Sequence, residues 1–413
     1  MPMTCSNPAW CPCVVGPQTG QMLELGHPLV LRDRYTDAWP QTACGALLLL
    51  QDQQGRPLAW ALRDADGPVV ARVIAAPASA AAELLSVDWF VRRLTQAVQL
   101  RRDHVDLEQT DAYRLVNGEG DGLSGLTLDC YAGHLLLQMY GHCWQLHRRA
   151  LQEAIVRLLA PVSLHEKFRP RQTRGLSREE QQDLCRLVHG QAPPAPLLVQ
   201  ENGLYFQVDL MAGLHSGLFM DQRDNRRDLM RRVAGRRVLN LFAYTGAFSV
   251  AAAAAGARQV TSVDLSAAAL QQARQNFGHN RLNPKRHAFI CADCFEILPQ
   301  LGQQAERFDL VLMDPPSFSS TAKSRFTTAA GTVSLVRQVL DLLEPGGLLI
   351  ASSNHQKTDL ADYLKLLRRA ALDAVAGLRV IHCGGQSGDF PHSVSFPEGR
   401  YLKYVVAVKT AMV

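Results

Sequence analysis

An aspartate followed by two prolines closes a short apolar run in MDPPSF (313–318). The preceding residues FDLVL (308–312) have the composition of a buried strand. Proline cannot donate a ladder hydrogen bond and also restricts the residue before it, so this strand has to end stiffly. Such a terminus can hold the Asp314 carboxylate and nearby carbonyl groups in one place. By itself the motif is also typical of a rigid surface turn.

A second loop of chemical interest is LNLFAYTGAFS (239–249), which joins an expected strand at 236–242 to an expected helix at 247–256. Gly246 permits a tight turn and a close approach of the backbone to a ligand. The loop contains one glycine, so it does not match the GxGxxG pattern that binds dinucleotides. We therefore expect a ligand that needs no pyrophosphate cradle.

Aspartates also end the next expected strands, with Asp264 closing 259–264 and Asp293 closing 287–293. A carboxylate at the position of Asp264 can accept both hydroxyls of a ribose. Asp293, or the backbone beside it, can accept from an adenine amino group. One aspartate at a strand end is usually a cap for the following helix. Three such aspartates, with Asp314, outline a pocket for an adenosine-containing cofactor, and S-adenosylmethionine fits this pocket better than NAD.

The elements that position these residues follow an alternating pattern after residue 230. Such alternation predicts an α/β fold, with an open parallel sheet covered by helices on both faces. Ligands of these sheets bind beyond the carboxyl ends of the strands. The expected strands are 236–242, 259–264, 287–293, 308–314 and 347–353, and the expected helices are 247–256, 266–280 and 330–343.

The first 200 residues have a different pattern. Residues 43–64 read as two strands around the turn QDQQG, and residues 67–75 read as a third strand. We therefore predict a small β-rich module at 22–78, a central α+β module at 79–200 and a catalytic domain at 201–413. Within the central module we expect helices at 79–103 and 144–159 and strands with hairpins within 113–140. The proline-rich segment QAPPAPLLVQENG (191–203) marks the boundary near residue 200.

Composition narrows the class of protein. Of the 413 residues, 47% are hydrophobic and 20% are charged, which is ordinary for a soluble protein. No apolar run approaches the roughly 18 residues of a membrane span, and the first 25 residues show no secretory pattern. Ten irregularly spaced cysteines favour reduced thiols. We therefore expect a cytoplasmic protein that does not interact with a membrane.

The cysteine pairs do not predict a metal site. Cys5, Cys11 and Cys13 lack an identifiable fourth ligand. Cys291 and Cys294 flank Asp293 and read as buried thiols.

A basic segment points to a polyanionic partner. The formal net charge of +5 is small, and the excess lies in the C-terminal half. The segment HEKFRPRQTRGLSR (165–178) carries five basic residues and one glutamate. Its residues Lys167, Arg169 and Arg171 are candidates for contacts with RNA phosphates.

Three stretches together resemble the class I S-adenosylmethionine-dependent rRNA methyltransferases of the RlmI and RlmK group. They are LNLFAYTGAFSVAAAAAGARQVTSVDLS (239–266), the DPP sequence (314–316) and SFPEGRYLKYV (395–405). HSGLFMDQRDNRR (215–227) is similar to the group's lead-in to the first cofactor strand. The segments 26–35 and 113–129 resemble its PUA-like and central modules. The resemblance covers roughly residues 24–408 and implies a Rossmann-like catalytic domain.

The resemblance implies a role for each matching position. Asp221, Gln222 and Arg223 would close the cofactor pocket, with Arg223 pairing the methionine carboxylate unless it forms a surface ion pair instead. Asp264 and Leu265 would hold the ribose side, and Asp293 and Cys294 the adenine side. The residues facing the methionine end of S-adenosylmethionine would be Phe242, Tyr244, Thr245, Gly246, Ala247 and Phe248, with Asp314 next to them.

One departure from the group bears on chemistry. Methylation of cytosine at C5 needs a thiolate to attack C6. RlmI-like enzymes carry a Ser-Cys-Ser type sequence where PGGLLIASSNHQ (345–356) has Ser352, Ser353 and Asn354. This difference favours methylation at a ring nitrogen such as guanine N7, where alignment of a lone pair is the main requirement.

If the enzyme methylates a ring nitrogen, the predicted catalytic residues are Asp314, Pro315 and Asn354. Pro316 and Phe318 would contact the extruded base, with Phe318 stacking on it. The expected partner is 23S rRNA or its precursor particle, and a homodimer is possible.

Two alternatives stay open. The first is cytosine C5 methylation with a cysteine from elsewhere in the chain, and the second is a catalytically weak RNA-binding assembly factor.

Overall fold

The computed structural model describes residues 10–65, 67–169, 184–211, 215–316, 319–320, 325–326 and 328–412. The predictions for Cys5, Arg171 and Phe318 lie outside these residues. The chain divides into two compact units. The first contains 1–197, 209–216 and 388–399, and the second contains 198–208, 217–387 and 400–413. The three-part domain division expected from the sequence stays a prediction.

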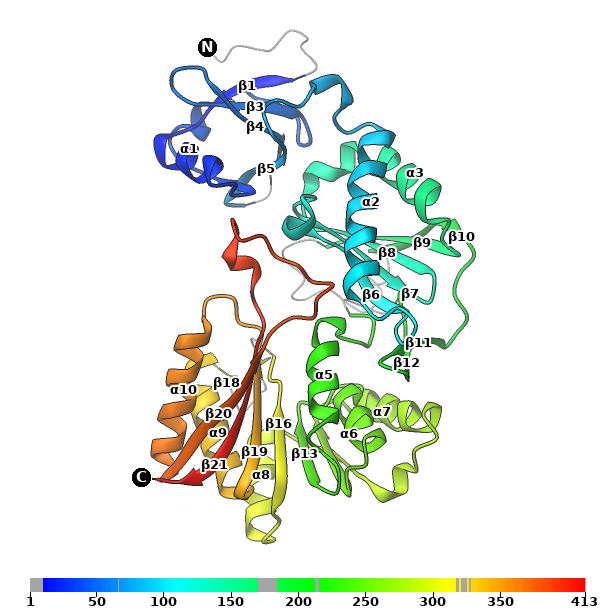
Figure 1. Cartoon of the computed structure of the whole chain (residues 1–413), viewed down its shortest axis with the longest axis vertical. Coiled ribbons are helices and arrows are strands. Elements are labelled where there is room, and N and C mark those ends of the chain that lie inside the picture. The colour runs from blue at the N-terminus through cyan, green and yellow to red at the C-terminus, as the bar shows by residue number, and fades with distance from the viewer. Residues whose placement is uncertain are drawn as a thin grey trace. The chain divides into compact units, whose positions relative to one another are not determined.

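The first unit begins with a five-stranded sheet (Figure 1). Its strand order is β1 (Cys11–Val14), β3 (Leu47–Gln51), β4 (Pro57–Arg63), β5 (Val69–Ala75) and β2 (Leu29–Leu31). β1 pairs in parallel with β3, so the sheet starts at residue 11 and not near residue 22 as expected. Helix α1 (Pro17–Glu24) follows β1.

A second five-stranded sheet follows in the same unit. It has the order β10 (Cys185–Gly190), β9 (Ser163–Phe168), β8 (His134–Met139), β7 (Leu126–Tyr131) and β6 (Ala112–Asn117). Helix α2 (Val87–His104) starts later than expected because Ser86 caps it, accepting from the Trp89 amide at 3.2 Å. Helix α3 (Arg148–Leu159) connects the parallel strands β8 and β9. Trp60, Phe90 and Trp144 belong to one buried cluster, so the two sheets share a core.

The second unit is built on a seven-stranded sheet. Its order is β15 (Ala288–Cys291), β14 (Gln259–Asp264), β13 (Arg237–Leu241), β16 (Phe308–Met313), β19 (Leu343–Ser353), β21 (Lys403–Ala411) and β20 (Ala376–Gly384). The first five strands in this order pair in parallel, as expected. β21 pairs antiparallel with both β19 and β20, so the parallel sheet expected from the sequence contains one antiparallel strand. The last strand of the chain, β21, therefore lies between β19 and β20.

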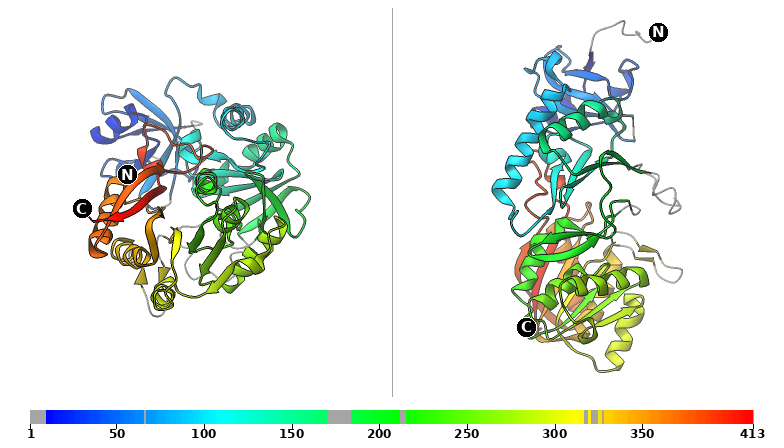
Figure 2. Two further views of the ribbon diagram at one scale, coloured as in Figure 1. Left: turned by 60° about the horizontal axis from the view of Figure 1, so that its bottom comes forward. Right: turned by 90° about the vertical axis from the view of Figure 1, so that its right-hand side faces the viewer.

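Alternate residues of these strands enter two separate cores, as the period of two in a strand requires. Leu239, Leu241, Val311 and Met313 pack with α8 (Cys294–Gln303), α9 (Thr328–Leu342) and α10 (Leu360–Asp373). Val238, Leu310, Leu312 and Ile350 pack on the other face with α5 (Arg223–Met230) and α6 (Ala247–Ala254). Figure 2 shows the sheet between α9 and α10 on one side and α5 to α7 on the other. The sheet is therefore covered on both faces, as predicted.

Short elements complete the second unit. The hairpin β11 (Leu197–Glu201) and β12 (Leu204–Val208) contacts α7 (Ala267–His279) through the Gln207 amide, which donates to Asn276 Oδ1 at 2.9 Å. β17 (Ser319–Ser320) pairs with β18 (Arg325–Phe326). Within the described ranges, no helix is long and apolar enough to cross a membrane.

Candidate active site

The strand register brings the predicted site residues to one edge of the seven-stranded sheet. Leu241 pairs with Val263, Asp264 pairs with Cys291, and Met313 pairs with Ala351. Because these strands are parallel, the loops after β13, β14, β15, β16 and β19 leave the same edge. The residues that the sequence predicts as strand ends therefore come together around a single site.

The loop after β13 has an unusual backbone. Phe242 and Tyr244 have φ of 58° and 50°, in the left-handed region that non-glycine residues seldom adopt. Gly246 has φ of 77°, and a Cβ there would lie 2.7 Å from Ala273 Cβ. Glycine is therefore required at this position both by conformation and by the approach of α7. Strained backbone of this kind concentrates at functional sites.

Side chains hold this loop from outside. The Thr245 hydroxyl donates to the Gly217 carbonyl oxygen at 2.6 Å, and Asn276 Nδ2 donates to the Thr245 carbonyl oxygen at 2.9 Å. Phe219, which is 42% exposed, places its ring 5.4 Å from that of Tyr244. Sequence reasoning assigned no role to Phe219. An aromatic pair therefore stands at the end of the central strand.

Asp264 ties the first two loops together. Its Oδ2 accepts from the Tyr244 amide and its Oδ1 from the Ser266 amide, both at 2.8 Å. Each carboxylate oxygen has a second lone pair, so the group can still accept from a ligand hydroxyl. Leu265, the next residue, is 53% exposed. The Asp264 carboxylate is thus suited to accept from a ribose, and the exposed Leu265 side chain is suited to contact the base attached to it.

Asp293 has the structural role of a helix cap. Its Oδ1 accepts from the Phe295 amide at 2.8 Å at the start of α8. The Cys294 thiol is buried in the core under α8, and burial raises its pKa to about 12. Phe248 is also in a core, with the Arg226 guanidinium 5.4 Å from its ring centroid. The side chains of Phe248 and Cys294 are therefore buried in the cores, and their predicted cofactor contacts stay predictions.

A buried glutamine organises the loop after β16. Asn225 Nδ2 donates to Gln222 Oε1 at 2.6 Å, which fixes the orientation of the Gln222 amide. Gln222 Nε2 then donates to Asp314 Oδ2 and to Ser352 Oγ, both at 2.9 Å. Pro315 is buried and Pro316 is exposed. The Asp314 carboxylate is thus positioned by a fixed donor, as its stiff strand terminus suggested.

A second carboxylate, that of Asp221, lies close enough to affect Asp314. Burial, together with the negative charge of Asp221, raises the pKa of Asp314 to about 6. The hydrogen bonds from Gln222 and Ser352 act in the opposite direction. Asp221 Oδ2 accepts from the Tyr401 hydroxyl at 2.7 Å, and its carbonyl oxygen accepts from the Ser387 amide at 2.9 Å. A carboxylate that titrates near neutral pH is a common feature of catalytic sites.

The Arg223 side chain is 3% exposed and therefore does not lie on the surface. Its Nε nevertheless forms an ion pair with Asp224 Oδ1 at 3.7 Å, so the alternative of an ion pair stays open. Its predicted pairing with a methionine carboxylate stays a prediction. The neighbouring Arg226, which sequence reasoning did not select, is buried against Glu201 with two contacts of 2.6 Å.

A lysine on β21 positions the loop that follows β19. Ser352 and Ser353 are buried, whereas Asn354 is exposed at the strand end. Lys403 Nζ donates to the His355 and Tyr401 carbonyl oxygens at 2.6 and 2.7 Å. Burial lowers the pKa of Lys403 to about 8. Tyr401 and Lys403 belong to the stretch SFPEGRYLKYV, but the sequence offered no signal for their partners, which are distant in the chain.

The two described members of the basic segment lie in the first unit. Lys167 is 1% exposed, and its Nζ donates to the Leu210 carbonyl oxygen at 3.3 Å. Burial lowers the pKa of Lys167. A phosphate contact needs an accessible ammonium, so the structure contradicts the prediction for Lys167. The Arg169 guanidinium is 5.9 Å from the Tyr140 ring centroid, and its RNA contact stays a prediction.

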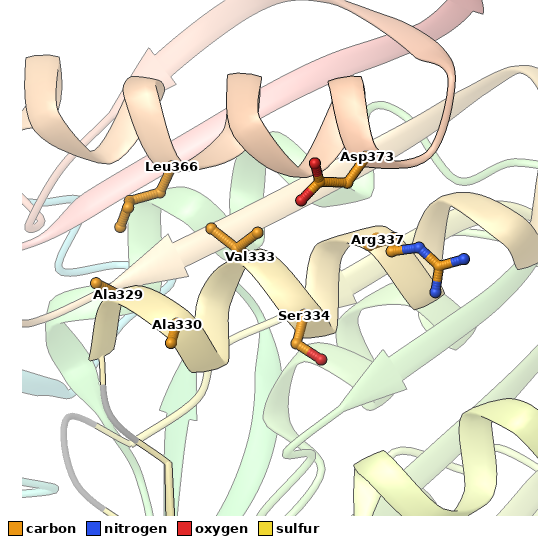
Figure 3. Close-up of a pocket in the computed structure, with 7 residues that line it drawn as sticks. All are labelled: Ala329, Ala330, Val333, Ser334, Arg337, Leu366 and Asp373. Atoms are coloured by element: carbon orange, nitrogen blue, oxygen red, sulfur yellow. The ribbon is translucent and has the colours of Figure 1, made fainter.

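The second unit also has an open groove between α9 and α10, with a volume of about 470 Å³ (Figure 3). Ala329, Val333 and Leu366 line its apolar part, and Arg337 and Asp373 lie farther along it. None of the predicted cofactor or catalytic residues lines this groove. The predicted strand-end site and this groove are therefore separate.

Strand order, strand-end carboxylates and a loop with one essential glycine define a class I S-adenosylmethionine-dependent methyltransferase. Residues 114–392 match the model of the family described as S-adenosylmethionine-dependent methyltransferase. A relative from Erwinia tasmaniensis, named ribosomal RNA large subunit methyltransferase I, is 35% identical over 91% of this chain and 94% of its own. A protein of the same name from Aeromonas salmonicida is 33% identical over 78% of this chain and 81% of its own.

Solved structures agree. A methyltransferase crystallised with S-adenosylhomocysteine aligns with a TM-score of 0.85 and 27% identity, covering 96% of this chain and all of that one. The chain belongs to the S-adenosylmethionine-dependent methyltransferase family that includes the large subunit methyltransferases I. Its cofactor is S-adenosylmethionine.

The contacts of Asp264 lead to a prediction about cofactor affinity. Asp264→Ala removes the predicted acceptor for the ribose and releases the Tyr244 amide. We expect the dissociation constant for S-adenosylmethionine to rise about tenfold, the scale of a lost charged hydrogen bond. Isothermal titration calorimetry measures this change, and thermal melting checks that the variant is folded. An unchanged dissociation constant in a folded variant would refute the assignment.

Proposed function

We propose that this enzyme methylates a base of large-subunit (23S) rRNA at a ring nitrogen such as guanine N7. The observation that carries the choice of atom is the sequence Ser352-Ser353-Asn354 at the end of β19. Gln222 Nε2 bonds both Ser352 and Asp314, so this strand end adjoins the predicted base-binding carboxylate. The names of the curated relatives support the choice of RNA. We place the reaction in the cytoplasm.

The proposed chemistry needs alignment more than acid or base catalysis. When bound, S-adenosylmethionine supplies a methyl group attached to a positively charged sulfur. Guanine N7 has an in-plane lone pair and no proton to lose, so no residue has to remove one. Asp314 would accept hydrogens from the amino edge of the base, and Pro315 would keep that carboxylate in place. Asn354 is exposed at the adjacent strand end and would orient the base from its other side.

Cytosine C5 methylation is a second candidate because two exposed thiols lie on the same sheet. Cys383 on β20 and Cys291 on β15 are the exposed cysteines of the described part of the chain. Cys291 Sγ lies 3.4 Å from the Leu265 carbonyl oxygen, at the predicted adenosine end. Cys383 is therefore the better candidate for a nucleophile from elsewhere in the chain.

A covalent trap separates the two candidates. The C5 route forms a bond between a cysteine thiol and cytosine C6, and 5-fluorocytidine prevents its release. We expect no stable adduct when the enzyme and S-adenosylmethionine are incubated with rRNA containing 5-fluorocytidine. Denaturing electrophoresis and peptide mapping detect an adduct, and Cys383→Ser and Cys291→Ser are the matched variants. A crosslink that forms in the wild type and is lost in either variant would contradict methylation at a ring nitrogen and support methylation at cytosine C5.

Mapping the modified nucleoside then identifies the product. Mass spectrometry of 23S rRNA from a strain lacking this protein, compared with its parent, shows which nucleoside loses a methyl group. Loss of 7-methylguanosine supports the proposal, and loss of 5-methylcytidine contradicts it.

A further inference from the structure

Two buried amide side chains, those of Gln222 and Asn225, lie in the hydrogen-bond network of the Asp314 carboxylate. Both residues are 3% exposed. Gln222 ends the short helix η5 (Met220–Gln222), and Asn225 lies in the first turn of α5. A side-chain amide can turn over, which exchanges its donor and its acceptor. What fixes the two amides therefore decides whether Asp314 faces a donor or an acceptor.

A backbone carbonyl fixes the direction of this network. Asn225 Nδ2 donates to the Gly385 carbonyl oxygen at 3.0 Å, and a carbonyl oxygen can only accept. The same nitrogen donates to Gln222 Oε1 at 2.6 Å, so the nitrogen of Gln222 has to face the other way. There it donates to Asp314 Oδ2 and to Ser352 Oγ, both at 2.9 Å. The direction set at Gly385 is thus passed through two amides to Asp314.

The Ser352 hydroxyl follows the same direction. Its oxygen accepts from Gln222 Nε2, so its one proton goes to an acceptor. The two acceptors within reach are the Lys403 carbonyl oxygen at 3.1 Å and the Asp314 carboxylate. A reversed Gln222 amide would instead aim its Oε1 at Asp314, and two acceptors that face each other repel. Because donors to a carboxylate favour its charged form, the network favours the ionised, accepting state of Asp314.

Other titratable groups act on the same carboxylate from neighbouring elements. Burial and the charge of Asp221, just before α5, raise the pKa of Asp314, and Arg226 on α5 lowers it. Burial, followed by the charge of Asp314, raises the pKa of Tyr363 on α10, so Tyr363 stays neutral where Asp314 titrates. Asp221, Arg226 and Tyr363 lie outside the amide pair. A change confined to the two amides therefore leaves these groups in place.

We propose that Gln222 and Asn225 are positioning residues for methyl transfer, because the fixed direction of their hydrogen bonds holds Asp314 as an oriented acceptor for the target base. The proposal rests on the proposed function, in which Asp314 accepts from that base. It gives Gln222 a role different from the cofactor contact predicted from the sequence. Both amides act through the carboxylate, so their effect belongs in kcat and in the pH dependence of the rate more than in cofactor affinity.

Gln222→Met tests the last step of the network. Methionine is similar in length and has no donor, so Asp314 loses one hydrogen bond while no charge changes. This loss disfavours the ionised carboxylate, whose pKa is about 6 in the wild type, and so raises that pKa. On an unmodified 23S rRNA transcript we expect kcat to fall about tenfold, with the dissociation constant for S-adenosylmethionine within about threefold. The pH below which kcat/KM for S-adenosylmethionine falls should rise by about one pH unit, the scale of one charged hydrogen bond.

Asn225→Asp tests the direction itself at a residue one step away from the carboxylate. An ionised aspartate has no donor, so the Gln222 amide has to turn its nitrogen toward this residue and its oxygen toward Asp314. We again expect the rate to fall at a higher pH than in the wild type. In a Gln222→Met background there is no amide to turn, so adding Asn225→Asp should shift the profile less. The difference between the two backgrounds is the effect of the turned amide, separated from that of the added charge.

Asn283→Asp is the matched control. Asn283 is exposed, and its side chain accepts from the Lys285 amide at 3.0 Å as the cap of a short helix. Aspartate caps such a position equally well, so the substitution adds the same charge to the second unit without touching the network. Its pH profile and kcat should match those of the wild type.

Carbon NMR measures Asp314 directly, on enzyme made with aspartate that carries ¹³C at its side-chain carboxyl. Asp314→Asn assigns the signal, and no RNA is needed. A higher pKa of Asp314 in Gln222→Met, with no change in Asn283→Asp, supports the proposal. A folded Gln222→Met variant with the kcat and pH profile of the wild type would overturn it. A loss of cofactor affinity as large as the loss of kcat would also overturn it and assign Gln222 to the cofactor.

Early melting of one variant leaves the test open to the other, because Gln222→Met and Asn225→Asp both predict a higher pKa of Asp314. Failure of the proposed function looks different. Mapping of the rRNA would then show no loss of 7-methylguanosine, whereas the titration of Asp314 in the enzyme without RNA would still differ between the variants. Failure of the positioning role alone would leave that loss in place and the titration unchanged.

Discussion

Replacing Asp314 with alanine is expected to lower kcat by about 10²–10³-fold, the scale at which misplacing a reacting group affects rates. The carboxylate receives a hydrogen bond from Gln222, and Gln222 is itself held by Asn225. This chain of contacts aims Asp314 at one position, where a target base would present its amino edge. The dissociation constant for S-adenosylmethionine is expected to change less than about fivefold, because we predict that Asp264, and not Asp314, binds the ribose.

Steady-state kinetics and calorimetry on the same preparation test this separation. Asp309→Asn is a suitable control because Asp309 lies on the same strand but accepts from the Arg237 amide at 2.7 Å, at the opposite end of β16. Its kcat should stay within about twofold of the wild-type value. A fall in kcat of less than threefold in Asp314→Ala would show that Asp314 does not position the base. A matching loss of cofactor affinity would assign Asp314 to cofactor binding alone.

The strand-end residues could be predicted because their positions follow from local patterns. Short apolar runs mark the strands β13, β14 and β16, and a parallel sheet brings the ends of such strands to one edge. The sequence alone therefore predicts that Gly246 and Asp264 lie at this edge of the sheet. Asp293 followed the usual role of an aspartate at a strand end and caps α8. Whether it also binds adenine depends on groups outside this local pattern.

Partners from distant parts of the chain could not be predicted. Tyr401 bonds Asp221 across 180 positions, and Gln222 bonds Ser352 across 130. No local pattern encodes such pairs, since each depends on how β21 and the segment before α5 are placed on the sheet. β20 was missed for another reason. It is an edge strand whose residues include exposed Val380 and Ile381, so it lacks the alternation of a half-buried strand.

Lys167 shows how charge can mislead. A run of basic residues usually lies on the surface, which led to the predicted phosphate contact. In the structure Lys167 occupies β9, a strand whose first five residues are all buried. The ammonium finds a backbone carbonyl as its acceptor. The burial of this lysine is recognisable only from tertiary structure.

The neighbouring carboxylates Asp221 and Asp314 predict an acidic limb in the pH profile of the reaction. Burial and the charge of Asp221 raise the pKa of Asp314 to about 6, so the ionised form is present above this pH and is lost below it. The ionised form is the better acceptor for amino hydrogens. We therefore expect kcat/KM for S-adenosylmethionine, which reports the enzyme before the cofactor binds, to fall about thirtyfold between pH 8 and pH 4.5.

Two variants identify the group that titrates. Asp314→Asn cannot ionise, so its lower rate should not show the limb near pH 6. Asp221→Asn removes the neighbouring negative charge but keeps an oxygen for the Tyr401 hydroxyl, so the pKa of Asp314 should fall and the limb should move to lower pH. Initial rates in buffers of constant ionic strength, with melting curves at each pH, measure these shifts. A limb that keeps its position in both variants would show that another group titrates, because neither substitution would then have altered the ionisation that controls the rate.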